Sequence, residues 1–232
     1  MTADAPRPAP SDGDDAAPLS DAQKSLRAQM LATEHWSLLA SRSTTQSEVL
    51  TRIAIFLTLV SAGLVTLGVL GNATGFRGWF GVAALAVLAL LVLLGAITQL
   101  RVFNTATEDL AYVLAMNRLR GAYLDLDPGI ERYLLMGTSD DETGIGITYY
   151  PFAMRDRSQV FASSAMVMLV VNTALIGLFV GAIVSAFGGS LAWSIVVGAI
   201  VALVHFVLWM LKGYRSYRHI LGVHVPLRRA AD

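Results

Sequence analysis

Four long runs of the chain contain no acidic or basic residue, and these runs limit what it can fold into. A helix rises about 1.5 Å per residue and the hydrocarbon layer of a bilayer is about 30 Å thick, so roughly 20 apolar residues suffice to cross it. The runs lack the alternation of a membrane β-barrel, and backbone polar groups in lipid must be satisfied internally. We therefore predict an all-α polytopic membrane protein with four transmembrane helices in two hairpins. The runs cover 53–70, 80–100, 160–187 and 191–211.

Composition excludes several kinds of chemistry. Only 15% of the 232 residues are charged, compared with about 25% in a soluble domain. The chain has no cysteine, which removes thiolate nucleophiles, disulfides, iron–sulfur clusters and cysteine-based zinc sites. It also has no Walker loop, nucleophile elbow or dinucleotide fingerprint. We therefore expect no cofactor, no metal site and no nucleic-acid partner; the expected partners are the lipid bilayer and further copies of the chain.

The basic residues predict the orientation. Only Arg77 lies in a loop between paired spans, and the other 16 precede the first span, lie between the second and third, or follow the fourth. The positive-inside rule then places both termini and the long middle segment in the cytoplasm. Arginine outnumbers lysine 15 to 2, which indicates a high-GC bacterium. The expected location is thus the inner membrane of a bacterial cell, as a multi-pass protein.

The segments outside the lipid differ in composition. Residues 1–19 are rich in Pro, Ala and Asp and predict a disordered tail. In 20–52, Ser20 and Gln23 have the spacing of a capping box, which predicts a cytoplasmic amphipathic helix that continues into the first span. The remaining units are the first transmembrane hairpin, the cytoplasmic helical segment, the second hairpin and the basic cytoplasmic tail, at 53–100, 101–159, 160–211 and 212–232.

The middle segment carries most of the acidic residues. Asp127 and Pro128 suit an N-cap and the first position of a short helix that runs to about Met136. Residues 138–146 then predict a loop, since they contain glycines and a solvated acidic run. A divalent cation site is the alternative interpretation, but the spacing fits no EF-hand loop, so we favour a solvated face. The acidic residues are Asp125, Asp127, Asp140, Asp141 and Glu142.

Small residues recur along one face of each helix of the second hairpin. Residues four apart lie on one helix face, and small ones let two backbones approach closely. The short connection makes the two helices antiparallel neighbours, and the register pairs 185 with 194, 181 with 198 and 177 with 202. We favour packing within the hairpin over a pore or a subunit interface. The helix-packing residues are Thr173, Gly177, Gly181, Ser185, Ser194, Gly198 and Ala202.

Two polar residues in these spans are candidates for a polar or gating layer. His205 is the only titratable group in any predicted span, and the register places it beside Thr173 as a hydrogen-bond partner. Asn172 lies about 100° away, toward another helix or subunit. We favour a structural histidine, with gating or pH sensing as the alternative.

The carboxyl tail has a net charge of +4, whereas the middle segment has −3. Anionic lipid headgroups attract each nearby basic side chain, so the tail could lie on the inner leaflet. It could equally dock on the acidic segment, or act only as a topology signal. The basic residues expected to contact lipid or a partner are Lys212, Arg215, Arg218, Arg228 and Arg229.

Two stretches resemble a family of bacterial, mainly actinobacterial, four-span integral membrane proteins with no established activity. The resemblance covers roughly 26–145, and it implies only a shared four-span layout. The residues that carry it are Glu34-His35-Trp36-Ser37-Leu38-Leu39-Ala40, Arg42-Ser43, Phe56-Leu57-Thr58, Met116-Asn117-Arg118-Leu119-Arg120, Tyr123-Leu124 and Asp140-Asp141-Glu142.

Three functional hypotheses follow. The first is a non-enzymatic membrane protein that oligomerises or binds a partner through its cytoplasmic helices. The second is a small passive channel or pore-forming effector gated near His205. The third is a membrane-embedded enzyme that acts on lipid headgroups with Asp140, Asp141 and His219. Active transport is disfavoured, because no predicted span contains Asp, Glu, Lys or Arg.

Overall fold

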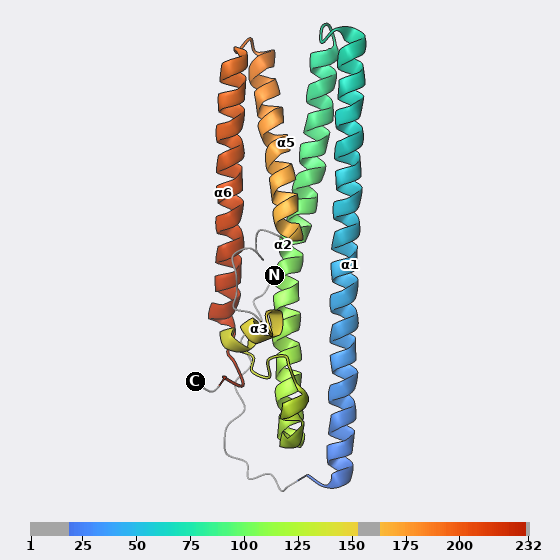
Figure 1. Ribbon diagram of the computed structural model, residues 1–232, viewed down its shortest axis with the longest axis vertical. Helices are drawn as coiled ribbons and strands as arrows, with labels where there is room; N and C mark the ends of the chain where they lie inside the picture. Colours follow the sequence, from blue (N-terminus) through green and yellow to red (C-terminus); the bar gives the residue numbers. More distant parts are fainter. Residues whose placement is uncertain (1–18, 153–162, 231–232) are drawn as a thin grey trace, which may run out of the picture.

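The computed structural model describes residues 19–152 and 163–230, and within these ranges every regular element is a helix. Four of the helices are long and apolar enough to cross a membrane, which confirms the predicted all-α, multi-pass membrane architecture. Figure 1 shows them as two antiparallel hairpins standing side by side. The elements are α1 (Asp21–Thr74), α2 (Phe80–Leu126), η1 (Pro128–Tyr133), α3 (Glu142–Tyr149), α5 (Ser164–Ala186) and α6 (Leu191–Val223).

The first hairpin extends far beyond the thickness of a bilayer. α1 has 54 residues and α2 has 47, which correspond to about 80 and 70 Å of helix against about 30 Å of hydrocarbon. In Figure 1 both helices continue well past α5 and α6 at the same end. We call this part, made of 21–52 in α1 and 101–126 in α2, the stalk. It lies outside the charge-free runs.

The start of α1 follows from local sequence. Ser20 Oγ accepts a hydrogen bond from the Gln23 amide at 3.3 Å, and Gln23 Oε1 accepts one from the Ser20 amide at 2.9 Å. This reciprocal pair satisfies two amides of the first turn that have no partner within the helix. It confirms the predicted capping box, and the helix then continues without interruption through the first span.

The apolar core lies where α1, α2 and α5 meet. Val49, Ile53, Phe56 and Val60 follow one another at intervals of four and three residues, so they lie on one face of α1. They pack against α2, and Met168 of α5 joins the same cluster. α2 thus connects the two hairpins.

The second hairpin packs in the predicted register. An added Cβ on Gly177 would lie 3.1 Å from the Cβ of Ala202, and one on Gly198 would lie 3.5 Å from the amide nitrogen of Gly181. On the other side, the same Cβ of Gly198 would lie 2.5 Å from the carbonyl oxygen of Gly177. The two backbones therefore touch, because these positions carry no side chain.

One expectation for the segments outside the lipid was wrong: the expected loop 138–146 contains the start of α3, whose N-cap is Asp141. The predicted short helix after Asp127 is present as a 3₁₀ helix, but it ends at Tyr133 rather than at about Met136, because the chain turns extended at Leu134. Beyond the charge-free run that ends at 211, α6 continues to Val223. The third span begins at Ser164, and the expected positions 160–162 lie outside the described residues.

We predict that Gly198→Val will destabilise the second hairpin. Its Cβ would press on the Gly177 carbonyl, and a backbone atom cannot move aside as a flexible side chain can. Overpacking of this kind costs about 1–3 kcal/mol. Thermal unfolding in detergent should therefore show a lower midpoint for the variant.

Gly81→Val is the matched control for this substitution. Gly81 lies in α2, and a Cβ there would meet nothing within 4 Å, so the control should unfold close to wild type. Equal losses in the two variants would contradict close contact between α5 and α6 at Gly198.

Candidate functional site

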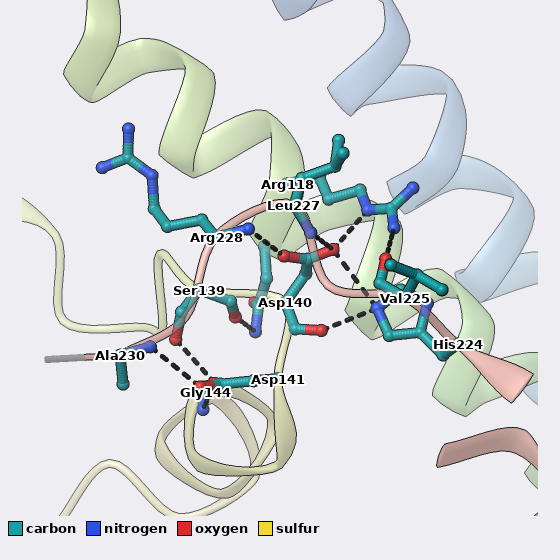
Figure 2. A network of polar contacts seen from close by, with 11 residues as sticks. Arg118, Ser139, Asp140, Asp141, Gly144, His224, Val225, Leu227, Arg228 and Ala230 are labelled. Carbon is teal, nitrogen blue, oxygen red and sulfur yellow. Dashed lines mark hydrogen bonds and ion pairs between the residues drawn. The ribbon is translucent and has the colours of Figure 1, made fainter. Parts of the chain in front are cut away.

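The acidic loop before α3 holds the carboxyl tail (Figure 2). Both carboxylate oxygens of Asp140 accept backbone amides from the tail: Oδ1 from Arg228 at 2.8 Å and Oδ2 from Leu227 at 3.1 Å. The Arg118 guanidinium of α2 also pairs with Oδ2. Asp140 has no exposed surface, so all of its charge is compensated by these contacts. We call Asp140 and its partners the tail anchor.

Further hydrogen bonds fix the tail on either side of Asp140. The Asp140 amide donates to the Arg228 carbonyl at 3.1 Å, and His224 Nε2 lies 2.7 Å from the Asp140 carbonyl oxygen. Asp141 accepts the Ala230 amide at 2.8 Å through Oδ2, while its Oδ1 caps α3 by accepting the Gly144 amide at 2.8 Å. The two neighbouring aspartates thus hold the tail over 224–230.

α2 positions this loop. Asn117 is fully buried and its Nδ2 donates to the Ser139 carbonyl at 3.0 Å, while its Oδ1 accepts from Thr148 at 2.8 Å. Gly121 faces the same loop, and a Cβ there would lie 2.8 Å from the Thr138 carbonyl oxygen. A side chain at 121 would therefore push the loop away from α2.

The tail anchor stabilises the charged form of Asp140. Burial alone would raise the pKa of this carboxyl. The Arg228 amide, the Arg118 guanidinium and the Leu227 amide together have a larger, opposite effect, so the pKa lies below its ordinary value. The pKa of Asp141 is lowered in the same way, with burial opposed by the Gly144 and Ala230 amides.

These contacts correct the predicted solvated acidic face. Asp140 is buried and binds the tail, and Asp125 pairs with the Arg228 side chain, whereas Asp127 and Glu142 are exposed, so the solvated-face prediction is wrong for Asp140. Asp127 does have its expected N-cap role, accepting the Gly129 amide at 2.9 Å. Among the described residues, no three His, Asp or Glu side chains are grouped as a metal site would require.

A second carboxylate, Asp109, joins three helices in the stalk. It forms an ion pair with Arg42 of α1 at 2.6 Å, and accepts hydrogen bonds from Gln46 at 2.8 Å and from the Tyr149 hydroxyl of α3 at 2.6 Å. Burial raises the pKa of Asp109, but the combined effect of Arg42 and Tyr149 is larger and brings this pKa below its usual range. Burial and the neighbouring carboxylate raise the pKa of Tyr149. α3 is thus fastened to both long helices.

Residues of the stretches 34–43, 116–120 and 123–124 lie along the stalk. His35 of α1 stacks on Tyr123 of α2 with ring centroids 6.0 Å apart, and burial together with nearby Arg120 lowers the pKa of His35. Asn117 and Arg118 belong to the α2 side of the tail anchor. These positions therefore connect the two long helices and the tail.

Within the predicted spans, two pairs of polar side chains bond between helices, whereas serines and threonines such as Thr58 and Ser61 bond carbonyls of their own helix. Asn172 was predicted to point toward another helix or another subunit. It points to another helix, α2, and its Nδ2 donates to Gln99 Oε1 at 2.5 Å. Both side chains are fully buried. The Thr173 hydroxyl lies 2.8 Å from His205 Nδ1, which is the expected hydrogen bond within the second hairpin. Gln99 is not among the predicted polar residues, although an amide inside a charge-free run is a signal for a polar pair.

The basic residues at the carboxyl end separate into groups. Arg228 binds the acidic segment, whereas Lys212 and Arg215 lie in the part of α6 that directly follows its charge-free run. Arg218 and Arg229 are exposed. His219 lies on α6, and it does not join the tail anchor, where both oxygens of Asp140 are occupied.

Comparison with known proteins adds no relative: the chain matches no family model, no curated protein and no solved structure. Its function must be argued from its own geometry.

We predict that Asp140→Asn will release the tail. The neutral amide cannot replace a carboxylate that accepts two backbone amides and a guanidinium, and loss of charged hydrogen bonds costs about 2 kcal/mol. Hydrogen–deuterium exchange of the amides in 224–230 should therefore be roughly thirty-fold faster. Glu142→Gln is the control: Glu142 is exposed, lies two residues away and makes no ion pair with the described part of the tail. Unchanged exchange in Asp140→Asn would contradict the anchor.

Acid should release the tail in the same way. Because the pKa of Asp140 is lower in the folded chain, its contribution is complete above the unfolded value of about 4 and is lost as the pH falls through the folded value. Exchange in 224–230 should accelerate below about pH 4 after correction for the intrinsic rate. A rate that stays constant down to pH 2 would contradict this assignment.

Proposed function

We propose that the protein is a non-enzymatic membrane scaffold that self-associates along α1. In this proposal the bundle lies in the inner membrane of a bacterial cell with the stalk and both termini in the cytoplasm, which the distribution of basic residues supports. This proposal rests on the face of α1 that is turned away from α2, which stays exposed over the whole length of the helix.

The exposed face carries a regular seam. Twelve positions follow one another at alternating intervals of four and three residues, and all twelve are exposed. Ten of them are Gly, Ala, Ser or Thr. The α1 seam consists of Thr33, Ser37, Ala40, Thr44, Ser47, Thr51, Ala54, Thr58, Ser61, Val65, Gly68 and Asn72.

The spacing and the residue sizes fit a parallel pair of identical helices. The membrane gives every copy of α1 the same direction and depth, so around a two-fold axis each seam residue meets its own counterpart. Small side chains allow that close approach, and the 3.5-residue repeat keeps the seam in contact along a left-handed supercoil. The opposite face of α1, with Val49, Ile53 and Phe56, is already occupied by α2.

Large apolar side chains border the seam outside the lipid. Trp36 is 71% exposed and Leu50 is 55% exposed, and each directly precedes a seam residue. Both lie before the charge-free run begins at 53, so lipid does not cover them. An interface with a second copy along the seam would bury both side chains. This observation favours oligomerisation over the channel hypothesis.

Oxidative cross-linking in membranes tests this proposal. The chain has no cysteine, so a single introduced cysteine reports one position. Ser47→Cys lies in the seam and should give a disulfide-linked dimer, because paired seam residues bring their Cα atoms within the roughly 7 Å that a disulfide needs. Ser41→Cys is the matched control: it is an equally exposed serine of the stalk outside the seam and should cross-link far less.

A second measurement separates stable association from collision. Light scattering of the purified protein in detergent should show a dimer or larger oligomer for wild type. Ala40→Leu combined with Ala54→Leu should shift it to the monomer, while Gly81→Leu on α2 should not. Equal cross-linking at 41 and 47, or a monomeric wild type, would contradict self-association along α1.

A further inference from the structure

A cavity of about 470 Å³ lies between α2, α3 and α6, within the size range of small-ligand sites. Its wall is amphipathic: Phe103, Leu110 and Ile220 supply apolar surface, and Thr107, Ser216 and Lys212 supply polar groups. The hydroxyls of Thr107 and Ser216 lie 3.4 Å apart across α2 and α6. The tail anchor is separate from it, since Asp140 does not line this cavity.

The cavity lies where the lipid ends. The charge-free runs of α2 and α6 stop at 100 and 211, one turn or less before Phe103 and Lys212. Trp209 lies between them in space, with its ring 4.8 Å from that of Phe103 and 4.4 Å from Lys212 Nζ. Aromatic and basic residues of this kind mark the boundary between hydrocarbon and headgroups. Acyl chains therefore lie on one side of the cavity and water on the other.

A shallow groove on the outer side of α6 leads to the same place. It is lined by Leu208 and Leu211 toward the lipid and by Arg215 and His219 away from it, and it shares Lys212 and Ser216 with the cavity. Leu208 is 60% exposed. Among the described residues, no carboxylate lies within 4 Å of Lys212 or Arg215, and Lys212 Nζ lies over the Trp209 ring.

We propose that this groove and cavity bind an anionic glycerophospholipid of the adjoining leaflet. Its acyl chains lie along Leu208 and Leu211, its phosphodiester is bound by Lys212 and Arg215, and its headgroup hydroxyls enter the cavity. Basic side chains at this depth attract anionic headgroups and can donate hydrogen bonds to the phosphate.

The lining favours a hydroxyl-bearing headgroup. Thr107, Ser216 and the carboxylate of Glu142 line the cavity and can accept hydrogen bonds from hydroxyls. Glu142 would repel an additional negative charge there, so a single phosphodiester with a glycerol headgroup fits better than a multiply charged one. The site does not depend on self-association along α1, because its lining comes from other helices.

Native mass spectrometry of the full chain in detergent tests the proposal, with phosphatidylglycerol as the probe and phosphatidylcholine as the comparison. Wild type should retain phosphatidylglycerol preferentially. Lys212→Gln with Arg215→Gln should weaken its binding by roughly five-fold per charge removed. Arg218→Gln is the matched control: Arg218 is an exposed arginine of the same helix that lines neither the cavity nor the groove.

Further variants and ligands distinguish binding in the cavity from attraction to general surface charge. Ser216→Leu fills the shared wall without a change of charge, so it should also reduce the preference for phosphatidylglycerol, and thermal unfolding checks that each variant is folded. Three results would overturn the proposal. The first is that wild type does not prefer phosphatidylglycerol over phosphatidylcholine, and the second is that Arg218→Gln and the double variant lose phosphatidylglycerol binding equally. The third is that glycerol 3-phosphate binds as tightly as the lipid, which would assign the site to a soluble phosphate.

Discussion

Inside the hydrocarbon layer only the protein can satisfy a polar group, and the rest of the structure depends on this constraint. It imposes four helices whose backbone bonds close within each helix. It also explains why Asn172 bonds to Gln99 and Thr173 to His205, while the serines and threonines of the spans bond carbonyls of their own helices. Each pair joins two helices, so the polar groups add specificity to packing that depends mainly on small residues and shape.

Outside the lipid, buried carboxylates take over this connecting role. Asp109 binds Arg42, Gln46 and Tyr149 and thereby ties α1, α2 and α3 together. Asp140 binds α2 and the tail in the same manner. A carboxylate has about four acceptor sites, so one buried aspartate can hold several segments, provided that all of its charge is compensated. These two carboxylates act beside a small apolar cluster of Leu110, Val113 and Leu114 of α2 with Ile145 of α3.

The sequence predicted features that depend on local or periodic signals. The spans, the capping box at Ser20 and the register of the second hairpin follow from helix geometry and a short connection. Docking of the tail on the acidic segment was one of the alternatives that the sequence left open, but the burial of Asp140 depends on a contact with a segment 88 residues later, which no local signal selects. α3 was missed since its glycines favoured a turn, although Asp141 three residues before Gly144 was an N-cap signal.

The tail anchor also decides which basic residues remain for other ligands. The acidic middle segment and the basic tail have opposite net charges, and the Arg228 side chain of the tail forms an ion pair with Asp125 of the middle segment, while the Arg228 amide donates to Asp140. Lys212 and Arg215 lie earlier in the chain, within α6 at the boundary of the lipid, and take no part in that contact. Neutralisation at one end of the carboxyl segment thus leaves its beginning as the positively charged part that faces the bilayer.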